Sequence, residues 1–139
     1  MAIPMKHPNL EIAQRAWEAV AASDVPSLES LWAPEIVWHV TGDNPWSGDH
    51  VGRDAVLDYL AGVGEAGEAY DTKVLDMLAS DERVLIVCDV RARRAGRSVD
   101  TQQCMLARIQ DEKIAEVWTM PLDPRAFVGF WRETERKTG

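Results

Sequence analysis

The feature that most constrains the fold is a run of four strand-like segments in the second half of the chain. These segments are rich in Val, Leu and Ile, and they span residues 70–79, 83–94, 98–110 and 113–120. The connections at Ala95-Gly96-Arg97 and at Gln110-Asp111-Glu112-Lys113 are short enough to be hairpin turns. We therefore predict an antiparallel sheet for this half.

The first half is predicted to be mainly helical. Asn9 can cap a first helix and Asp24 can cap a second, which Pro34 would end. A third helix follows Gly52, and the glycines at 62, 64 and 67 are expected to end it. Between the second and third helices, residues 36–41 have the pattern of a short strand. The spacing of the first helix predicts a buried face made of Leu10, Ala13, Trp17 and Val20.

Helices followed by a run of hairpins are typical of an α+β fold rather than an alternating α/β fold. Because no linker, repeat or low-complexity tract interrupts the pattern, we predict a single domain over residues 1–139. A chain of this length can bury roughly two-thirds of its unfolded surface, so it needs no metal or disulfide to fold.

The charge balance excludes some classes of partner. The chain has 15 Lys and Arg against 23 Asp and Glu, a net charge of −8, which disfavours nucleic acids and anionic membranes. The longest aliphatic stretch, Val84 to Cys88, is too short to span a bilayer, and the first residues contain no apolar run of signal-peptide length. The two cysteines are expected to be free thiols in a reducing compartment, which predicts a cytoplasmic protein.

Tryptophan is the unusual part of the composition. Six of the ten aromatic residues are Trp, and such an excess suits a large core, a ligand pocket or an interface. Trp17 and Trp32 have the helix-face positions of core residues. Trp46 lies in a loop rich in Gly, Pro and Asn, where it could cover a cavity mouth.

Several short motifs together resemble the nuclear transport factor 2-like superfamily, and within it the SnoaL-like branch. The motifs are Val37-Trp38-His39-Val40-Thr41-Gly42, Ser47-Gly48 running into Gly52-Arg53-Asp54-Ala55, the hairpin Arg94-Ala95-Gly96-Arg97, Ile114-Ala115-Glu116-Val117-Trp118, and Asp123-Pro124-Arg125-Ala126-Phe127. The resemblance extends from about residue 8 to residue 132. It implies a cone-shaped, curved antiparallel sheet with the N-terminal helices packed on its concave face around a deep apolar pocket. It also implies a homodimer formed through the outer sheet face.

The resemblance implies two classes of function, because one scaffold hosts many activities. The first is a cofactor-independent enzyme that acts by acid/base chemistry on an apolar cyclic or polyketide-like metabolite, as polyketide cyclases and ketosteroid isomerases do. The second is a non-catalytic protein that binds a small apolar molecule or serves as a scaffold. We expect no cofactor in either case. We also expect no metal, because the three histidines lack ligand spacing and no paired Cys motif is present.

His39 and Asp89 are the candidate catalytic residues. A histidine has a near-neutral pKa suited to moving a proton, and the resemblance places His39 where the steroid isomerases hold their carboxylate base. The oxyanion donors of those isomerases match Ala16 and Cys104, which disfavours steroid isomerisation. Asp89 could assist His39. An epoxide hydrolase could use Asp89 with Arg91, but its second acid matches Met120.

The residues expected to line the pocket are Trp17, Trp38, Trp46, Tyr59, Gln102, Cys104, Trp118 and Met120. Two alternatives remain for which face of the long hairpin points into the pocket. If the hairpin centres on Gly96, Cys88 lies opposite Cys104, and the two share a face. The pocket would then contain either Cys88, Val90, Gln102 and Cys104 or Asp89, Arg91, Gln103 and Met105. A shift of one residue in the turn would re-pair these sets. The two thiols could form a bridge, although small packed thiols are the commoner outcome.

Overall fold

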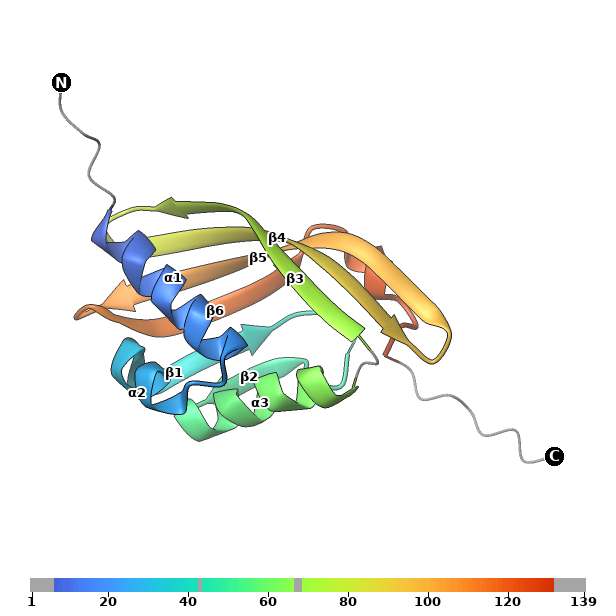
Figure 1. Cartoon of the computed structure of the whole chain (residues 1–139), viewed down its shortest axis with the longest axis horizontal. Helices are drawn as coiled ribbons and strands as arrows, with labels where there is room; N and C mark the ends of the chain where they lie inside the picture. The colour runs from blue at the N-terminus through green and yellow to red at the C-terminus, as the bar shows by residue number, and fades with distance from the viewer. Residues whose placement is uncertain (1–6, 43, 67–68, 132–139) are drawn as a thin grey trace, which may run out of the picture.

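The computed structural model describes residues 7–42, 44–66 and 69–131. The chain begins with helices α1 (Pro8–Ala21) and α2 (Val25–Leu31), then strands β1 (Trp32–Val40) and β2 (Gly48–Val51), then helix α3 (Arg53–Ala66). The remaining strands are β3 (Ala69–Ala79), β4 (Arg83–Arg94), β5 (Arg97–Gln110) and β6 (Lys113–Pro121), followed by a 3₁₀ turn, η1 (Pro124–Phe127). The three helices lie on one side of a curved sheet (Figure 1). The predicted α+β fold is therefore confirmed.

The sheet has six strands in the order β2-β1-β6-β5-β4-β3. Neighbouring strands are antiparallel except β1 and β6, which run parallel. The antiparallel pairing predicted for the second half is therefore confirmed, and the parallel β1–β6 pair makes the whole sheet mixed. Because β1 and β6 are separated in the chain by β2, α3 and three further strands rather than joined by a hairpin, no tight turn requires them to run antiparallel.

The predicted boundaries were correct for the long strands and less so in the first half. The structure begins β1 at Trp32, so Pro34 lies in a strand instead of ending a helix. The pairing of β1 with β6 is irregular between Trp32 and Val37, and such an interruption tolerates a proline that cannot donate to the ladder. The short strand β2 was not predicted. Gly62 and Gly64 lie inside α3, where Gly62 makes room for the Trp46 ring.

Helix α1 is capped and packed differently from the prediction. The His7 imidazole, rather than the Asn9 side chain, accepts a hydrogen bond at the helix start, from the Asn9 backbone N–H. The Asn9 side-chain amide donates to the carbonyls of Ser80 and Asp81, which ties α1 to the β3–β4 turn. The buried residues of α1 are Asn9, Ala13, Ala16 and Ala19, whose small side chains allow the helix to lie close to the sheet.

The β4–β5 turn decides which side chains face the helices. Ala95 and Gly96 both have positive φ angles, 52° and 75°, as a two-residue type I′ turn requires. Arg94 therefore pairs with Arg97, and Cys88 lies opposite Gln103 instead of Cys104. This pairing differs from both alternatives that the sequence left open, and the buried inward residues of β4 and β5 include Ile86, Cys88, Val90, Gln103, Met105 and Ala107. Cys88 and Cys104 are both free thiols.

The core lies between the helices and the concave face of the sheet. Trp32, Ile36, Val56 and Val84 are each at most 1% exposed, and they come from β1, α3 and β4. No helix in the described residues is long and apolar enough to cross a membrane.

Truncation of the fully buried Ile36 tests this packing. Ile36→Ala is expected to lower the free energy of unfolding by about 2–5 kcal/mol, because it removes buried methyl groups and leaves a cavity. Val51→Ala, at a side chain that is 65% exposed, should change it by no more than about 0.5 kcal/mol. Denaturant unfolding measures both variants, and equal losses would contradict the assigned core.

Candidate functional site

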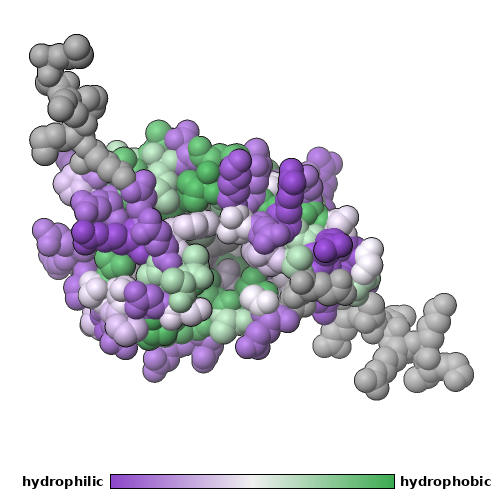
Figure 2. All heavy atoms as spheres, in the orientation of Figure 1, coloured by the Kyte–Doolittle hydropathy of each residue, from purple (hydrophilic) through white to green (hydrophobic). Residues whose placement is uncertain are grey.

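The concave face of the sheet encloses a cavity of about 240 Å³. Its apolar walls include Trp17, Trp32, Trp38, Leu60, Ile86 and Met105. These side chains come from α1, α3 and the inward positions of β1, β4 and β5. Figure 2 shows this face of the molecule hollowed near its centre, between α1 and α3. An apolar cavity of this kind suits a small apolar ligand.

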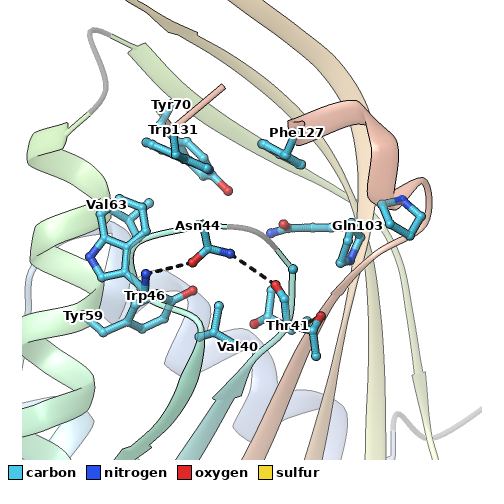
Figure 3. A pocket seen from close by; sticks show the side chains of 14 residues that line it. Val40, Thr41, Asn44, Trp46, Tyr59, Val63, Tyr70, Gln103, Phe127 and Trp131 are labelled. Carbon is cyan, nitrogen blue, oxygen red and sulfur yellow. Dashed lines mark hydrogen bonds between the residues drawn. The ribbon is translucent and has the colours of Figure 1, made fainter. Parts of the chain in front are cut away.

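A smaller compartment of about 60 Å³ adjoins the main cavity (Figure 3). Its aromatic walls are Trp46, Phe127 and Trp131, and the Trp46 and Trp131 rings meet edge to face with centroids 4.8 Å apart. Asn44 holds the Trp46 segment, because its side-chain oxygen accepts from the Trp46 backbone N–H over 2.9 Å. Trp46 therefore lines the smaller compartment, and its role as a cover over the cavity mouth stays a prediction.

The two compartments share a group of polar side chains where they meet. Tyr59, Tyr70, Gln103 and Thr119 line both of them. The Trp38 Nε1–H donates to Thr119 Oγ1 over 2.7 Å.

Both tyrosines are neutral at physiological pH. Burial raises the pKa of Tyr59 to about 12, and the nearby Thr119 offsets this only in part. Burial also raises the pKa of Tyr70, and the nearby Tyr59 adds to the shift. The two phenols can therefore donate hydrogen bonds to a ligand, but they are poor general bases at pH 7.

The described residues of the cavity walls carry no formal charge. Among the described residues that line the two compartments, none is Asp, Glu, Lys, Arg or His. Burial raises the pKa of the Cys88 thiol to about 11, so this thiol is not a ready nucleophile. Within the described ranges, no three His, Cys, Asp or Glu side chains gather as a metal site requires.

His50 supports the cavity from behind Tyr59. It lies on β2 opposite the inward Trp38, and its imidazole stacks on the Tyr59 ring with centroids 4.7 Å apart. The His50 Nε2 is hydrogen-bonded to the Trp46 carbonyl oxygen over 2.7 Å. The His50 imidazole thus contacts both the Tyr59 ring and the backbone of Trp46.

The candidate base His39 lies on the opposite side of the sheet from the cavity. It follows the inward Trp38 on β1, and successive side chains of a strand point to opposite faces. Its ring nitrogens lie 2.6 Å from Asp49 Oδ1 and 2.6 Å from Glu116 Oε2. Its ring stacks on Trp118 with centroids 5.1 Å apart. The expectation that His39 faces the pocket is therefore wrong.

The network around His39 favours its charged form. Burial opposes the imidazolium, but the hydrogen bonds to Glu116 and Asp49 outweigh it, and the pKa of His39 rises above its ordinary value of 6.5. The hydrogen bond with His39 and the contact of Arg108 Nε with Glu116, at 3.1 Å, lower the pKa of Glu116. These groups join β1, β2, β5 and β6 on the outer face.

The other predicted site residues divide between the two faces. Trp17, Trp38 and Tyr59 line the main cavity, and Trp46 lines the smaller compartment. Five predicted residues point to the outer face, which also carries His39. They are Asp89, Gln102, Cys104, Trp118 and Met120. Asp89 there accepts a hydrogen bond from Gln102 Nε2 over 3.3 Å. For Asp89, Gln102 and Cys104 the physical reason is the turn register, which points the even positions of β4 and the odd positions of β5 inward. Trp118 and Met120 lie on β6 opposite the outward Leu106 and Cys104.

The sequence reasoning missed Tyr70, Thr119 and His50, and left Gln103 as an alternative. From the sequence, Tyr70 begins the predicted strand 70–79 and Thr119 lies inside the predicted strand 113–120, with no site role predicted for either residue. Alternation from a correctly placed inward residue, such as Met105, would have identified Gln103.

Comparison with known proteins gives one family and several similar structures. The model of the SnoaL-like domain family matches residues 13–117. An uncharacterized protein of Mycobacterium tuberculosis is 28% identical over 125 residues, covering 88% of this chain and 95% of that protein. The structure of Bal32a, from a soil-derived mobile gene cassette, is 28% identical with a TM-score of 0.82, covering 90% of this chain and 97% of that one. IdmH of Streptomyces antibioticus, a candidate polyketide cyclase, is 20% identical with a TM-score of 0.69, covering 89% and 97%.

The charged network predicts a pH-dependent role for His39 in stability. Because the folded pKa is raised, the stabilisation is fully present below about pH 6.5, the unfolded value, and is lost as the pH rises through the folded value. His39→Ala should therefore destabilise the protein more at about pH 6 than at about pH 9. Denaturant unfolding at the two pH values measures the difference, and an equal or larger loss at the higher pH would contradict the charged network.

Proposed function

The chain belongs to the SnoaL-like family, and from this premise we propose that it binds a flat, uncharged cyclic molecule of polyketide type in the inner cavity. The observation that carries the proposal is an apolar cavity of about 240 Å³ whose polar side chains, among the described residues, are all neutral. The candidate polyketide cyclase among the similar structures supports the ligand class. The ligand would lie between the helices and the concave face of the sheet.

The shape and chemistry of the walls favour a flat ring system. Trp17, Trp38 and Tyr59 present aromatic surfaces to the cavity, and such surfaces pack well against flat rings. A charged ligand would lose its hydration without gaining a counter-charge, because the described lining has none. The neutral phenols of Tyr59 and Tyr70 can instead satisfy a carbonyl or hydroxyl oxygen.

A cofactor-independent cyclase is the second candidate function. The observation that favours it is the pair of neutral phenols lining an apolar cavity, where hydrogen-bond donors polarise a carbonyl more strongly than they do in water. His39 and Asp89 do not support base catalysis in the cavity, because both lie on the outer face. The epoxide hydrolase alternative loses its support for the same reason, since Asp89 and Arg91 point outward together.

Ligand binding can be measured directly by calorimetric titration with 9-fluorenone and 1-tetralone, two uncharged cyclic ketones. Val63 lines both compartments, so Val63→Trp should fill the space and weaken binding by about tenfold or more. His39→Ala should leave binding within about twofold of the unmodified protein, because His39 lies across the sheet.

Circular dichroism and a thermal melt establish that both variants remain folded. The cavity proposal is refuted if neither ketone binds, or if Val63→Trp has no effect on binding. A large loss of affinity in His39→Ala would place the ligand on the outer face instead.

We also propose that the outer face is where a second copy of the chain binds. Leu106, Trp118 and Met120 are half-buried apolar side chains on this face of the isolated chain. Charges of both signs surround them, including Arg91, Asp100, Arg108 and Glu116. A face that carries both signs can be complementary to itself, as a two-fold interface requires.

Sedimentation velocity tests this interface. Trp118→Glu should shift the protein toward monomer, because it places a charge in the apolar part of the face. Val25→Glu, at an exposed position on α2, serves as the matched control and should not change the mass. A monomer for the unmodified protein, or a dimer that survives Trp118→Glu, would contradict this assignment.

A further inference from the structure

We propose that the smaller compartment is a subsite for a short, hydroxyl-bearing substituent of the bound ring, and that Gln103 is the residue that selects the hydroxyl. This inference rests on the proposed function, because the ring itself would lie in the adjoining main cavity. It goes further by naming the chemistry of the ligand's side chain. That side chain would be an uncharged alcohol rather than an alkyl group, a carboxylate or an amine.

The smaller compartment has room for a few atoms but not for a ring system. Its volume of about 60 Å³ is a quarter of the 240 Å³ of the main cavity, and a space of this size holds only a few water-sized groups. Tyr59, Val63 and Gln103 line both spaces, so a molecule in the main cavity can extend a substituent past them. A flat ring and a short side chain would therefore occupy different compartments.

The walls of the smaller compartment are held in place by contacts from distant parts of the chain. The Trp131 ring meets the Trp46 ring edge to face, and it packs on Phe130 with centroids 4.7 Å apart. Arg94 Nη1 and Arg97 Nη1 each donate to the Phe130 carbonyl oxygen over 3.3 Å, which ties this segment to the β4–β5 hairpin. A wall that is already ordered binds a substituent without the entropic cost of ordering it.

Two polar side chains of the smaller compartment already serve the backbone. The Thr41 hydroxyl donates to the Thr119 carbonyl oxygen over 2.9 Å. The Asn44 side-chain amide donates to the Thr41 carbonyl oxygen over 3.2 Å, and its oxygen accepts from the Trp46 N–H over 2.9 Å. Thr41 and Asn44 thus stabilise the loop that shapes the compartment.

Gln103 is placed to contact the substituent. The register of β5 points it inward, it is only 9% exposed, and Figure 3 shows its side chain reaching into the pocket. A carboxamide carries two N–H donors and an oxygen with two acceptor positions. A hydroxyl group both donates and accepts, so it can satisfy the Gln103 amide more fully than a ketone or an ether can.

The ligand class follows from a neutral amide in an uncharged lining. A carboxylate or an ammonium substituent would lose its hydration, and none of the described lining residues offers a counter-charge. An alkyl substituent would suit the aromatic walls but would leave the buried amide without the partner that water supplied before binding. A short alcohol meets both requirements.

Calorimetric titration with matched naphthalenes tests this subsite. 2-Naphthaleneethanol and 2-propylnaphthalene differ only in a terminal hydroxyl or methyl group, and 2-naphthylacetate carries a carboxylate instead. The readout is the ratio of the alcohol affinity to the alkyl affinity. Gln103→Met should lower this ratio by at least about fivefold, because Met keeps the length of the side chain and removes its hydrogen bonds. The carboxylate should bind about tenfold more weakly than the alcohol.

Gln102→Met is the matched control, the same substitution at the next residue, which points to the outer face. It should leave the affinity ratio within about twofold of the unmodified protein. Phe127 lines only the smaller compartment, so Phe127→Trp should fill that space and weaken alcohol binding by about tenfold. The affinity for 9-fluorenone, which has no such substituent, should stay within about twofold.

NMR of the unmodified protein gives a readout that does not depend on the folding of a variant. The side-chain amide resonances of Gln103 should shift more with 2-naphthaleneethanol than with 2-propylnaphthalene. Those of Gln102, on the outer face, should stay in place.

The outcomes separate the two proposals. If neither 9-fluorenone nor any of the naphthalenes binds, the proposed function itself fails. If the ligands bind but Gln103→Met and Gln102→Met give the same ratio, or if Phe127→Trp weakens 9-fluorenone as much as the alcohol, the cavity is occupied and the subsite is overturned. A ratio lowered by Tyr70→Phe but not by Gln103→Met, or an unmoved Gln103 amide resonance, would overturn the role of Gln103. Tighter binding of the carboxylate than of the alcohol would overturn the ligand class.

Discussion

The two-residue turn at Ala95 and Gly96 determines what each face of the molecule can do. Because Arg94 pairs with Arg97, Cys88 lies opposite Gln103, and the even positions of β4 share the concave face with the odd positions of β5. A turn one residue longer would exchange the faces of one strand relative to the other. Gln103 and Met105 would then lie outside, and the cavity would lose a polar group and part of its apolar wall.

This register separates two chemically different surfaces on one sheet. The inner surface combines aromatic walls with neutral donors, Tyr59 and Tyr70, and the outer surface carries the charged network of His39, Asp49 and Glu116. Charged groups outside can remain hydrated, whereas the same groups inside would need partners. The arrangement suits recognition of an uncharged molecule, and the charged network contributes to the cohesion of the sheet.

The sequence predicts more of the fold than of the candidate site. The strands at 83–94 and 113–120 were located well, because long aliphatic runs between short turns leave little choice. The orientation of residues 36–40 was harder to predict. Ile36, Val37, Trp38 and Val40 place apolar side chains on both faces of the strand, so no alternation shows which face His39 occupies. Trp17, Trp38 and Tyr59 were identified correctly as lining residues. For β5 the prediction was off by one position, so Gln103 and Met105 face the cavity in place of Gln102 and Cys104.

The central claim is that a ligand occupies the concave face, and methyl NMR during a titration with 9-fluorenone tests it most directly. Ile86, Met105 and Val117 report on the cavity wall, and Val37, Leu106 and Met120 report on the outer face of the same strands. We expect the methyl resonances of the first group to shift progressively with added ketone while those of the second stay in place. Shifts confined to the outer group, with the cavity methyls unmoved, would contradict the claim.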